Sequence, residues 1–148
     1  MKILKFIFVL LAISLITFFT HFNNTKRVNP VVANYYSTLK ESLKEKGYSN
    51  NLLVISTKRS KWENIFFENF SAAAHDSRHL TNDAMDFLVG DINNDNFIDG
   101  KDVAIIYQVL NDEIILNQGG IGTYKKQGFL TKQMVHLDCR VEKKRWNY

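Results

Sequence analysis

The apolar N-terminus constrains the fold most, because it leaves the rest of the chain to form a separate domain. Residues 1–22 begin with a short basic segment containing Lys2 and Lys5, and continue with a nearly unbroken apolar run over residues 6–19. This run is shorter than the roughly 20 residues that cross a bilayer, and it has the length of the hydrophobic region of a secretory signal. No small-x-small cleavage site follows it. Three interpretations stay open: a cleaved signal peptide, an uncleaved N-terminal membrane anchor, or a buried core helix.

Either of the first two interpretations sends the rest of the chain across the inner membrane. We therefore expect an exported protein of the bacterial periplasm or cell envelope, anchored to the inner membrane if the leader is retained. A single cysteine, Cys139, excludes an intramolecular disulfide framework in that oxidising compartment. The formal net charge of +4 is too small to indicate nucleic acid as a partner.

The sequence after the leader predicts one α+β domain. The whole chain of 148 residues is 45% hydrophobic and 23% charged, which is typical of globular proteins. Residues 23–28 form a polar linker, and residues 29–148 are enough for one domain with a core. Predicted helices and strands are mixed there without a regular β-α-β alternation, which favours the α+β class. Helices are expected over residues 30–46, 62–70 and 103–110, and strands over residues 52–55, 84–89, 121–124 and 134–138.

The first predicted helix has well-defined ends. Asn29 suits the N-cap, Pro30 suits the first helical position, and Gly47 suits the C-terminal stop. Apolar residues recur at helical spacing between these ends, so we expect one face of the helix to be buried. They are Val32, Tyr35, Tyr36, Leu39 and Leu43.

Two histidines and an aspartate are candidates for a metal site. His79 and Asp86 would supply two ligands, and His136 would supply the third. A catalytic zinc ion takes three protein ligands and keeps one position for water. If residues 134–138 form a strand, His136 and Asp138 point to the same face. Spacing alone leaves open that these are ordinary surface or core polar residues.

Several ordered motifs resemble those of a known family. The segment Ser77-x-His79-x-x-Asn82-x-Ala84-x-Asp86 resembles the S-x-H-x-x-G-x-A-x-D motif of zinc D-Ala-D-Ala carboxypeptidases and murein endopeptidases. These enzymes share the Hedgehog/D-Ala-D-Ala-peptidase fold, so the resemblance implies a small antiparallel sheet with flanking helices. Three further segments match in the same order: residues 55–60 resemble S-x-x-R-[ST], residues 119–124 resemble G-G-[IL]-G-x-Y, and residues 135–146 resemble V-H-x-D…R-x-W.

The resemblance implies a role for each matching residue. His79, Asp86 and His136 correspond to the zinc ligands of the family. Arg59 corresponds to the arginine that faces the substrate carboxylate or the metal-bound water. Asp138 is the expected second carboxylate near the metal, either as the general base or as a residue that holds His136.

Two further consequences of the resemblance concern the cleft and a turn. Arg145 and Trp146 match the family ending, and we expect both to wall the substrate cleft. Asn82 stands where the motif has glycine, a residue that usually marks a positive φ at a turn. Because asparagine is among the best non-glycine residues in the left-handed region, we expect the turn to survive.

An acidic segment over residues 91–102 resembles an EF-hand-type calcium loop. Position 6 is Asn96 instead of glycine, and we expect asparagine to tolerate the left-handed turn there. Position 12 is aspartate, as in dockerin loops. The apolar Ile98 at position 8 is expected to tether the loop to the core. A solvated acidic turn is the alternative, and a dockerin-like docking module would need a second loop. The expected calcium ligands are Asp91, Asn93, Asp95, Asp99 and Asp102, with the backbone carbonyl of Phe97.

Two other reactive residues are not expected to act. His75 lies four residues before His79, but the intervening turn argues against a role as ligand. Cys139 lacks a suitable base partner and is interpreted as a small buried apolar residue.

The sequence therefore predicts an exported zinc metallopeptidase that acts on peptidoglycan stem peptides, as a D,D-carboxypeptidase or a murein endopeptidase. A structural calcium ion would hold the acidic loop. The alternative is a catalytically inactive zinc- and calcium-binding domain for cell-wall or protein recognition. A third possibility is a calcium-dependent docking module.

Overall fold

Five short strands pair into one sheet in the order β1-β2-β4-β3-β5. The computed structural model describes residues 2–22, 27–70, 76–124 and 133–147. Neighbouring strands are antiparallel, except that β5 runs parallel to β3. The strands are β1 (Leu52–Ser56), β2 (Ala84–Val89), β3 (Gly120–Tyr124), β4 (Met134–Asp138) and β5 (Lys144–Asn147). The helices are α1 (Lys2–Phe22), α2 (Pro30–Glu45), α3 (Lys61–Phe70) and α4 (Gly100–Val109), with a short 3-10 helix η2 (Arg78–Thr81) and a π-helical turn η3 (Leu110–Ile114).

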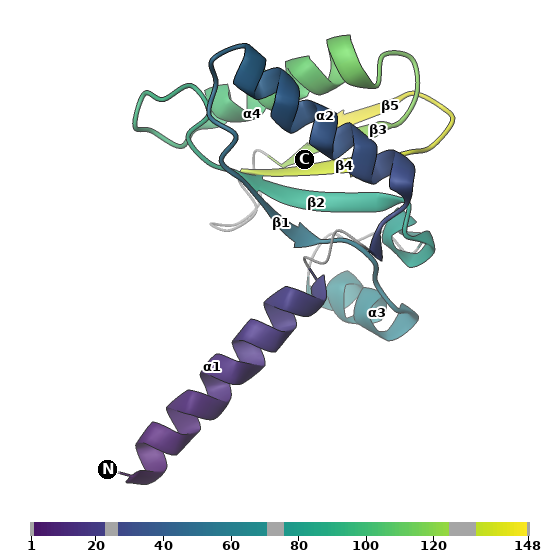
Figure 1. The fold of residues 1–148 in the computed structure, drawn as a ribbon. Helices are drawn as coiled ribbons and strands as arrows, with labels where there is room; N and C mark the ends of the chain where they lie inside the picture. The colour runs from purple at the N-terminus through teal and green to yellow at the C-terminus, as the bar shows by residue number, and fades with distance from the viewer. Residues whose placement is uncertain (1, 23–26, 71–75, 125–132, 148) are drawn as a thin grey trace.

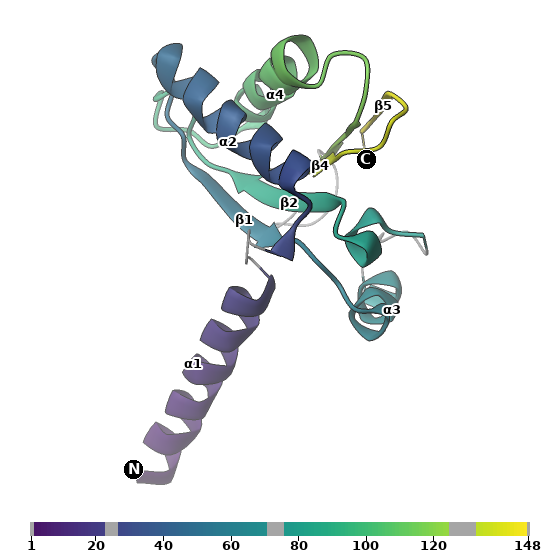
Figure 2. The ribbon, with the colours of Figure 1, turned by 45° about the vertical axis from the view of Figure 1, so that its right-hand side comes forward.

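The hydrophobic core lies between one face of the sheet and helices α2 and α4 (Figures 1 and 2). Each strand alternates its side chains between two faces, so every second residue of β2, β3 and β4 points toward these helices. The other face of the sheet is left for polar side chains. The core residues of these strands are Met85, Phe87, Val89, Ile121, Val135 and Leu137.

The predicted start and stop of α2 are confirmed. The side chain of Asn29 caps the helix by accepting a hydrogen bond from the backbone N–H of Val31 at 2.9 Å, and Pro30 opens the first turn. Gly47 has a φ of +76°, the left-handed geometry that ends a helix. Val32, Tyr35, Leu39 and Leu43 are buried, and Tyr36 packs against the core.

Two elements differ from the prediction. Helix α4 begins at Gly100 instead of Val103, because Asp99 and Asp102 form a capping box that starts the helix earlier. Strand β5 was not predicted, because its four residues are mostly polar and lie at the edge of the sheet. The strands over residues 84–89 and 134–138 are confirmed at both ends.

Helix α1 extends away from the sheet (Figure 1), and its described apolar side chains are exposed. Phe8 is 71% exposed and Leu11 is 62% exposed. These values exclude the interpretation of the leader as a buried core helix. Among the parts of the chain that the structure describes, no helix has the length and apolar character needed to cross a membrane.

Candidate metal centre

One row of paired residues crosses all five strands and carries the centre. Ser56 pairs with Asp86, Asp86 with His136, His136 with Gly122, and Gly122 with Trp146. Because residues paired across strands share a face, these side chains all lie on the face opposite the hydrophobic core. The sheet register therefore brings Asp86 and His136 side by side, although 50 positions separate them in the sequence.

The remaining donor, His79, comes from the 3-10 helix η2 that leads into β2. Ser77 caps η2, and Asn82 ends it with a φ of +67°. The predicted left-handed turn at Asn82 is therefore confirmed. The backbone N–H of Arg59 donates to the carbonyl of His79 at 3.0 Å, which ties η2 to the segment after β1. The side chain of His79 is only 2% exposed.

The three donor groups converge on one point. His79 Nε2 lies 3.0 Å from Asp86 Oδ2 without forming a hydrogen bond, and His136 Nδ1 lies 2.7 Å from Asp86 Oδ1. One donor atom from each residue lies within 4.8 Å of the others. All three residues are buried. Because their donor atoms lie so close together, His79, Asp86 and His136 could bind a metal ion.

Each imidazole has its second nitrogen bound to an acceptor. His79 Nδ1 lies 2.5 Å from the carbonyl oxygen of Thr57, which can only accept, so Nδ1 carries the proton and Nε2 presents a lone pair. His136 Nε2 lies 3.2 Å from Asp138 Oδ2. Such outer acceptors fix the tautomer and the orientation of metal-binding histidines.

The charged groups shift one another's pKa values. Burial alone lowers the pKa of His136, but its hydrogen bonds to Asp138 and Asp86 outweigh burial and raise the pKa to about 9. Burial alone would raise the pKa of Asp86, yet the two histidines hold it well below its usual value. Burial lowers the pKa of His79, so this ring is held neutral. This shift favours a protonated His136 between the carboxylates of Asp86 and Asp138.

Arg59 contacts a predicted metal ligand. Its Nη2 lies 2.6 Å from Asp86 Oδ2, and its Nε donates to Ser56 Oγ at 3.0 Å. The guanidinium is 9% exposed. Arg59 therefore holds Asp86, and its predicted role toward the substrate stays a prediction.

Asp138 is fully buried, and both of its oxygens accept hydrogen bonds from Arg140. Burial alone would raise its pKa, but His136 and Arg140 hold the pKa of this carboxyl far below its usual value. A general base needs access to water and a pKa near the working pH. Of the two roles predicted for Asp138, the geometry favours the one that holds His136.

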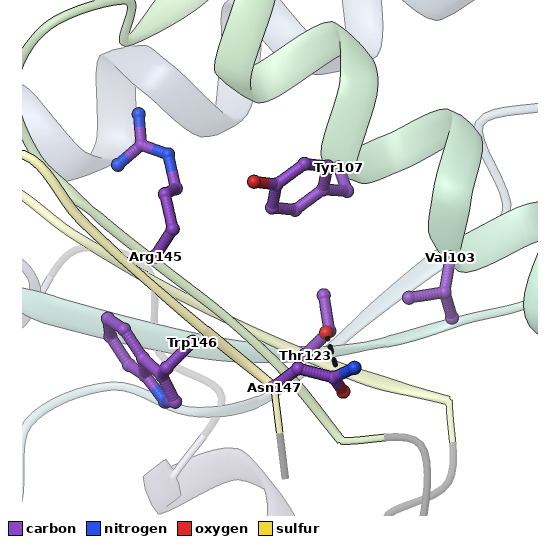
Figure 3. A pocket seen from close by; sticks show the side chains of 6 residues that line it. All are labelled: Val103, Tyr107, Thr123, Arg145, Trp146 and Asn147. Carbon is purple, nitrogen blue, oxygen red and sulfur yellow. Dashed lines mark hydrogen bonds between the residues drawn. The ribbon is translucent and has the colours of Figure 1, made fainter.

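The structure separates Arg145 from Trp146. The indole of Trp146 lies 5.3 Å from the ring of His136, centroid to centroid. The guanidinium of Arg145 instead donates to the side chain of Asn111 at 2.7 Å and to backbone carbonyls of the turn before β3. Figure 3 shows the two side chains leaving β5 in different directions. Of the two residues, only Trp146 contacts His136, so their predicted place in a substrate cleft stays a prediction.

Two glycines of β3 make room for the polar face of the sheet. A Cβ atom at Gly122 would lie 2.4 Å from the indole of Trp146, and one at Gly120 would lie 2.4 Å from the carboxylate of Asp138. These separations are far below van der Waals contact. The glycine-rich motif thus lets Trp146 lean toward His136 and Asp138 lie across β3.

A cavity of about 360 Å³ is lined by residues of α4, β3 and β5 (Figure 3). The aromatic ring of Tyr107 and the apolar side chain of Val103 line it from α4. None of the three metal-binding candidates lines this cavity. Its other lining residues are Thr123, Arg145, Trp146 and Asn147.

The acidic loop gives no support to the predicted calcium site. Asp102 is fully buried, and its oxygens accept backbone N–H groups of Ile92, Asn93 and Asp99. This carboxylate therefore connects the start of the loop to its end. Across the described ranges, only the group of His79, Asp86 and His136 brings three metal-binding side chains together. The other predicted ligands also serve the loop: Asp91 accepts from the N–H of Asn96, Asp95 from that of Phe97, and Asp99 from that of Lys101.

The tether predicted for this loop is wrong, although the turn is correct. Ile98 is 59% exposed, whereas Ile92 is fully buried and holds the loop to the core. Asn96 has a φ of +66°, as predicted for position 6.

Cys139 is half-buried and packs against the core, and His75 lies outside the described residues. Burial raises the pKa of the Cys139 thiol, which agrees with an unreactive side chain.

Comparisons of the chain with known protein families, with curated protein sequences and with solved structures find no match. Functional conclusions therefore depend on the residues of the centre itself.

Proposed function

We propose that this protein is an exported zinc-dependent peptidase that acts on peptidoglycan stem peptides, with a Hedgehog/D-Ala-D-Ala-peptidase-like fold. The observation that carries the proposal is the convergence of His79 Nε2, His136 Nδ1 and the carboxylate of Asp86 on one buried point. Three protein ligands that leave a further position open are characteristic of catalytic zinc sites. The ordered motifs of the sequence supply the peptidase class and the substrate.

The donor set fits zinc. Two imidazoles and one carboxylate are the ligand types that zinc takes in metallopeptidases. His79 Nε2 is buried and has no hydrogen-bond partner, as expected of an atom that is completed by a metal ion. The acceptors Thr57 and Asp138 set both imidazoles in the orientation that metal binding requires.

The surrounding residues have distinct roles in this proposal. A bound zinc ion would polarise the scissile carbonyl and lower the pKa of a water molecule to about 7. Arg59 holds Asp86 through its Oδ2, and Asp138 holds His136 through Nε2. Trp146 lies beside His136 and would contact substrate that approaches the metal from this side.

One observation favours a second candidate, a catalytically inactive metal-binding domain for cell-wall recognition. Both oxygens of Asp138 are engaged by Arg140, and both oxygens of Asp86 face other side chains. These two carboxylates are therefore not free to take a proton from water. The inactive domain would bind the same metal and the same peptides without hydrolysing them.

The two candidates differ in turnover. Purified full-length protein loaded with zinc should release peptides from peptidoglycan sacculi, and mass spectrometry should identify a shortened stem peptide or an opened crosslink. The variant His79→Ala should lose zinc and product together. Zinc-loaded wild-type protein that binds sacculi but releases no product would support the inactive domain and overturn the peptidase.

A further inference from the structure

The ion pair of Arg140 and Asp138 adjoins the three donor groups, because Asp138 contacts His136. Arg140 Nε donates to both oxygens of Asp138, at 2.8 and 3.1 Å, and Nη2 donates to Oδ2 at 2.5 Å. The backbone N–H of Arg140 adds a further bond at 3.1 Å. The side chain of Arg140 is 17% exposed and that of Asp138 is fully buried. A carboxylate held by this many donors has a single orientation.

Arg140 is itself held in place by an aromatic ring. Its guanidinium carbon lies 5.3 Å from the ring centroid of Trp146, within the range of a cation–π contact. Gly122 leaves the space in which this indole lies, and Gly120 leaves the space for the Asp138 carboxylate. The contacts therefore form a continuous chain from Trp146 through Arg140 and Asp138 to His136.

The orientation of His136 depends on the end of this chain. Imidazole can present either ring nitrogen to a metal, and the nitrogen that it presents is set by the hydrogen bond of the other nitrogen. Asp138 Oδ2 is the acceptor for Nε2, which leaves Nδ1 facing Asp86. If Asp138 were free to rotate, it would no longer select between the two nitrogens.

We infer that Arg140 is a positioning residue of the metal centre: it fixes Asp138, and Asp138 in turn directs His136 Nδ1 toward the metal. The inference rests on the metal site of the proposed function but does not require hydrolysis. It also explains why the carboxylate beside His136 Nε2 is buried and bound by an arginine instead of facing water.

Metal affinity of the full chain tests this inference. The variants are Arg140→Gln and Arg140→Lys, with Arg145→Gln as the matched control. Arg145 also makes several hydrogen bonds through its guanidinium, but it contacts Asn111 and backbone carbonyls and no residue of the centre. Affinity for Zn²⁺ and Co²⁺ is measured by competition with a chromophoric chelator, and the visible spectrum of bound Co²⁺ reports the ligand geometry.

Arg140→Gln should weaken metal binding by about 10- to 100-fold and change the Co²⁺ spectrum, as is typical when an outer partner of a metal ligand is removed. Arg140→Lys should recover part of the affinity, because an ammonium keeps the charge but not the two-pronged geometry. Arg145→Gln should stay within about 2-fold of the wild type.

Two outcomes would overturn the inference. One is wild-type affinity and spectrum in Arg140→Gln or, if that variant does not fold by circular dichroism, in Arg140→Lys. The other is an equal loss in Arg145→Gln, which would assign the effect to general destabilisation. Wild-type protein that binds metal but does not hydrolyse sacculi would contradict the proposed peptidase and leave the role of Arg140 intact.

Discussion

Raising the pH from 6 to 9 should strengthen metal binding by the centre, because the metal must displace a proton from His136. A metal ion binds only the neutral imidazole. The carboxylates of Asp86 and Asp138 outweigh burial and raise the pKa of His136 to about 9, so the ring is protonated at neutral pH. At pH 7, two units below this pKa, only about 1% of the rings are neutral, which weakens metal binding by about 100-fold.

The contribution of His136 to the apparent affinity should therefore rise by about 10-fold for each pH unit below 9 and level off above it. The folding stability of the protein without bound metal depends on pH with the opposite sign. The raised pKa of His136 adds stability that is fully present below its ordinary value of 6.5 and is lost as the pH rises through 9, on the order of 3 kcal/mol in total.

Isothermal titration calorimetry in buffers of different ionisation enthalpy measures the proton release directly. His136 should contribute about one proton for each zinc ion bound at pH 7 and about half a proton at pH 9, in addition to the proton lost by the zinc-bound water. The variant Asp138→Asn removes one of the two carboxylates that raise this pKa, so its affinity should level off at a lower pH. Affinity that does not change between pH 6 and 9 would refute the protonated bridge between Asp86 and Asp138.

Three further predictions follow from individual contacts. Gly122→Ala should destabilise the fold by about 1–3 kcal/mol, because the new methyl group meets an indole, whereas Gly100→Ala meets no atom within 4 Å and should be neutral by thermal denaturation. Asp102→Ala should lower the free energy of unfolding by about 2 kcal/mol or more in urea titrations, because three backbone N–H groups lose their acceptor, while exposed Asp112→Ala should have little effect. Above pH 9, where His136 is mostly neutral with or without Asp138, Asp138→Asn should weaken zinc binding by about 10-fold or more. Full zinc affinity with lost turnover would instead identify Asp138 as the general base.

Local signals in the sequence predicted much of the fold. The apolar runs of β2 and β4 and the capping residues Asn29 and Gly47 depend only on nearby positions, and the structure confirms them. Strand β5 has no such signal, because it is short, polar and paired on one side only. Without this strand, the opposite directions of Arg145 and Trp146 could not be predicted.

The donor group of the site was predictable, but most of its supporting contacts were not. His79, Asp86 and His136 were found from side-chain type and motif order, and the structure brings them together. Thr57 contributes a backbone carbonyl. Because every residue has one, the residue type does not reveal this contact. The contact of Arg59 with Asp86 depends on the irregular register between β1 and β2, which only the folded sheet defines.

The acidic loop shows what residue spacing leaves undecided. Its residue spacing matches a calcium loop, but the same oxygens also satisfy backbone N–H groups in a turn that precedes a helix. Spacing alone does not separate these two uses. Asp102 is the clearest case, because it is buried and its oxygens accept three backbone N–H groups of the loop.

The metal content of the purified full chain, determined by elemental analysis together with X-ray absorption spectroscopy, tests the central claim most directly. The account predicts a single zinc ion per chain, with two imidazole nitrogens and one carboxylate oxygen from the protein among its ligands. It also predicts that His136→Ala, once shown to be folded, loses the ion. Absence of zinc from gently purified protein that also fails to take up added zinc, or full retention of zinc in His136→Ala, would contradict the account.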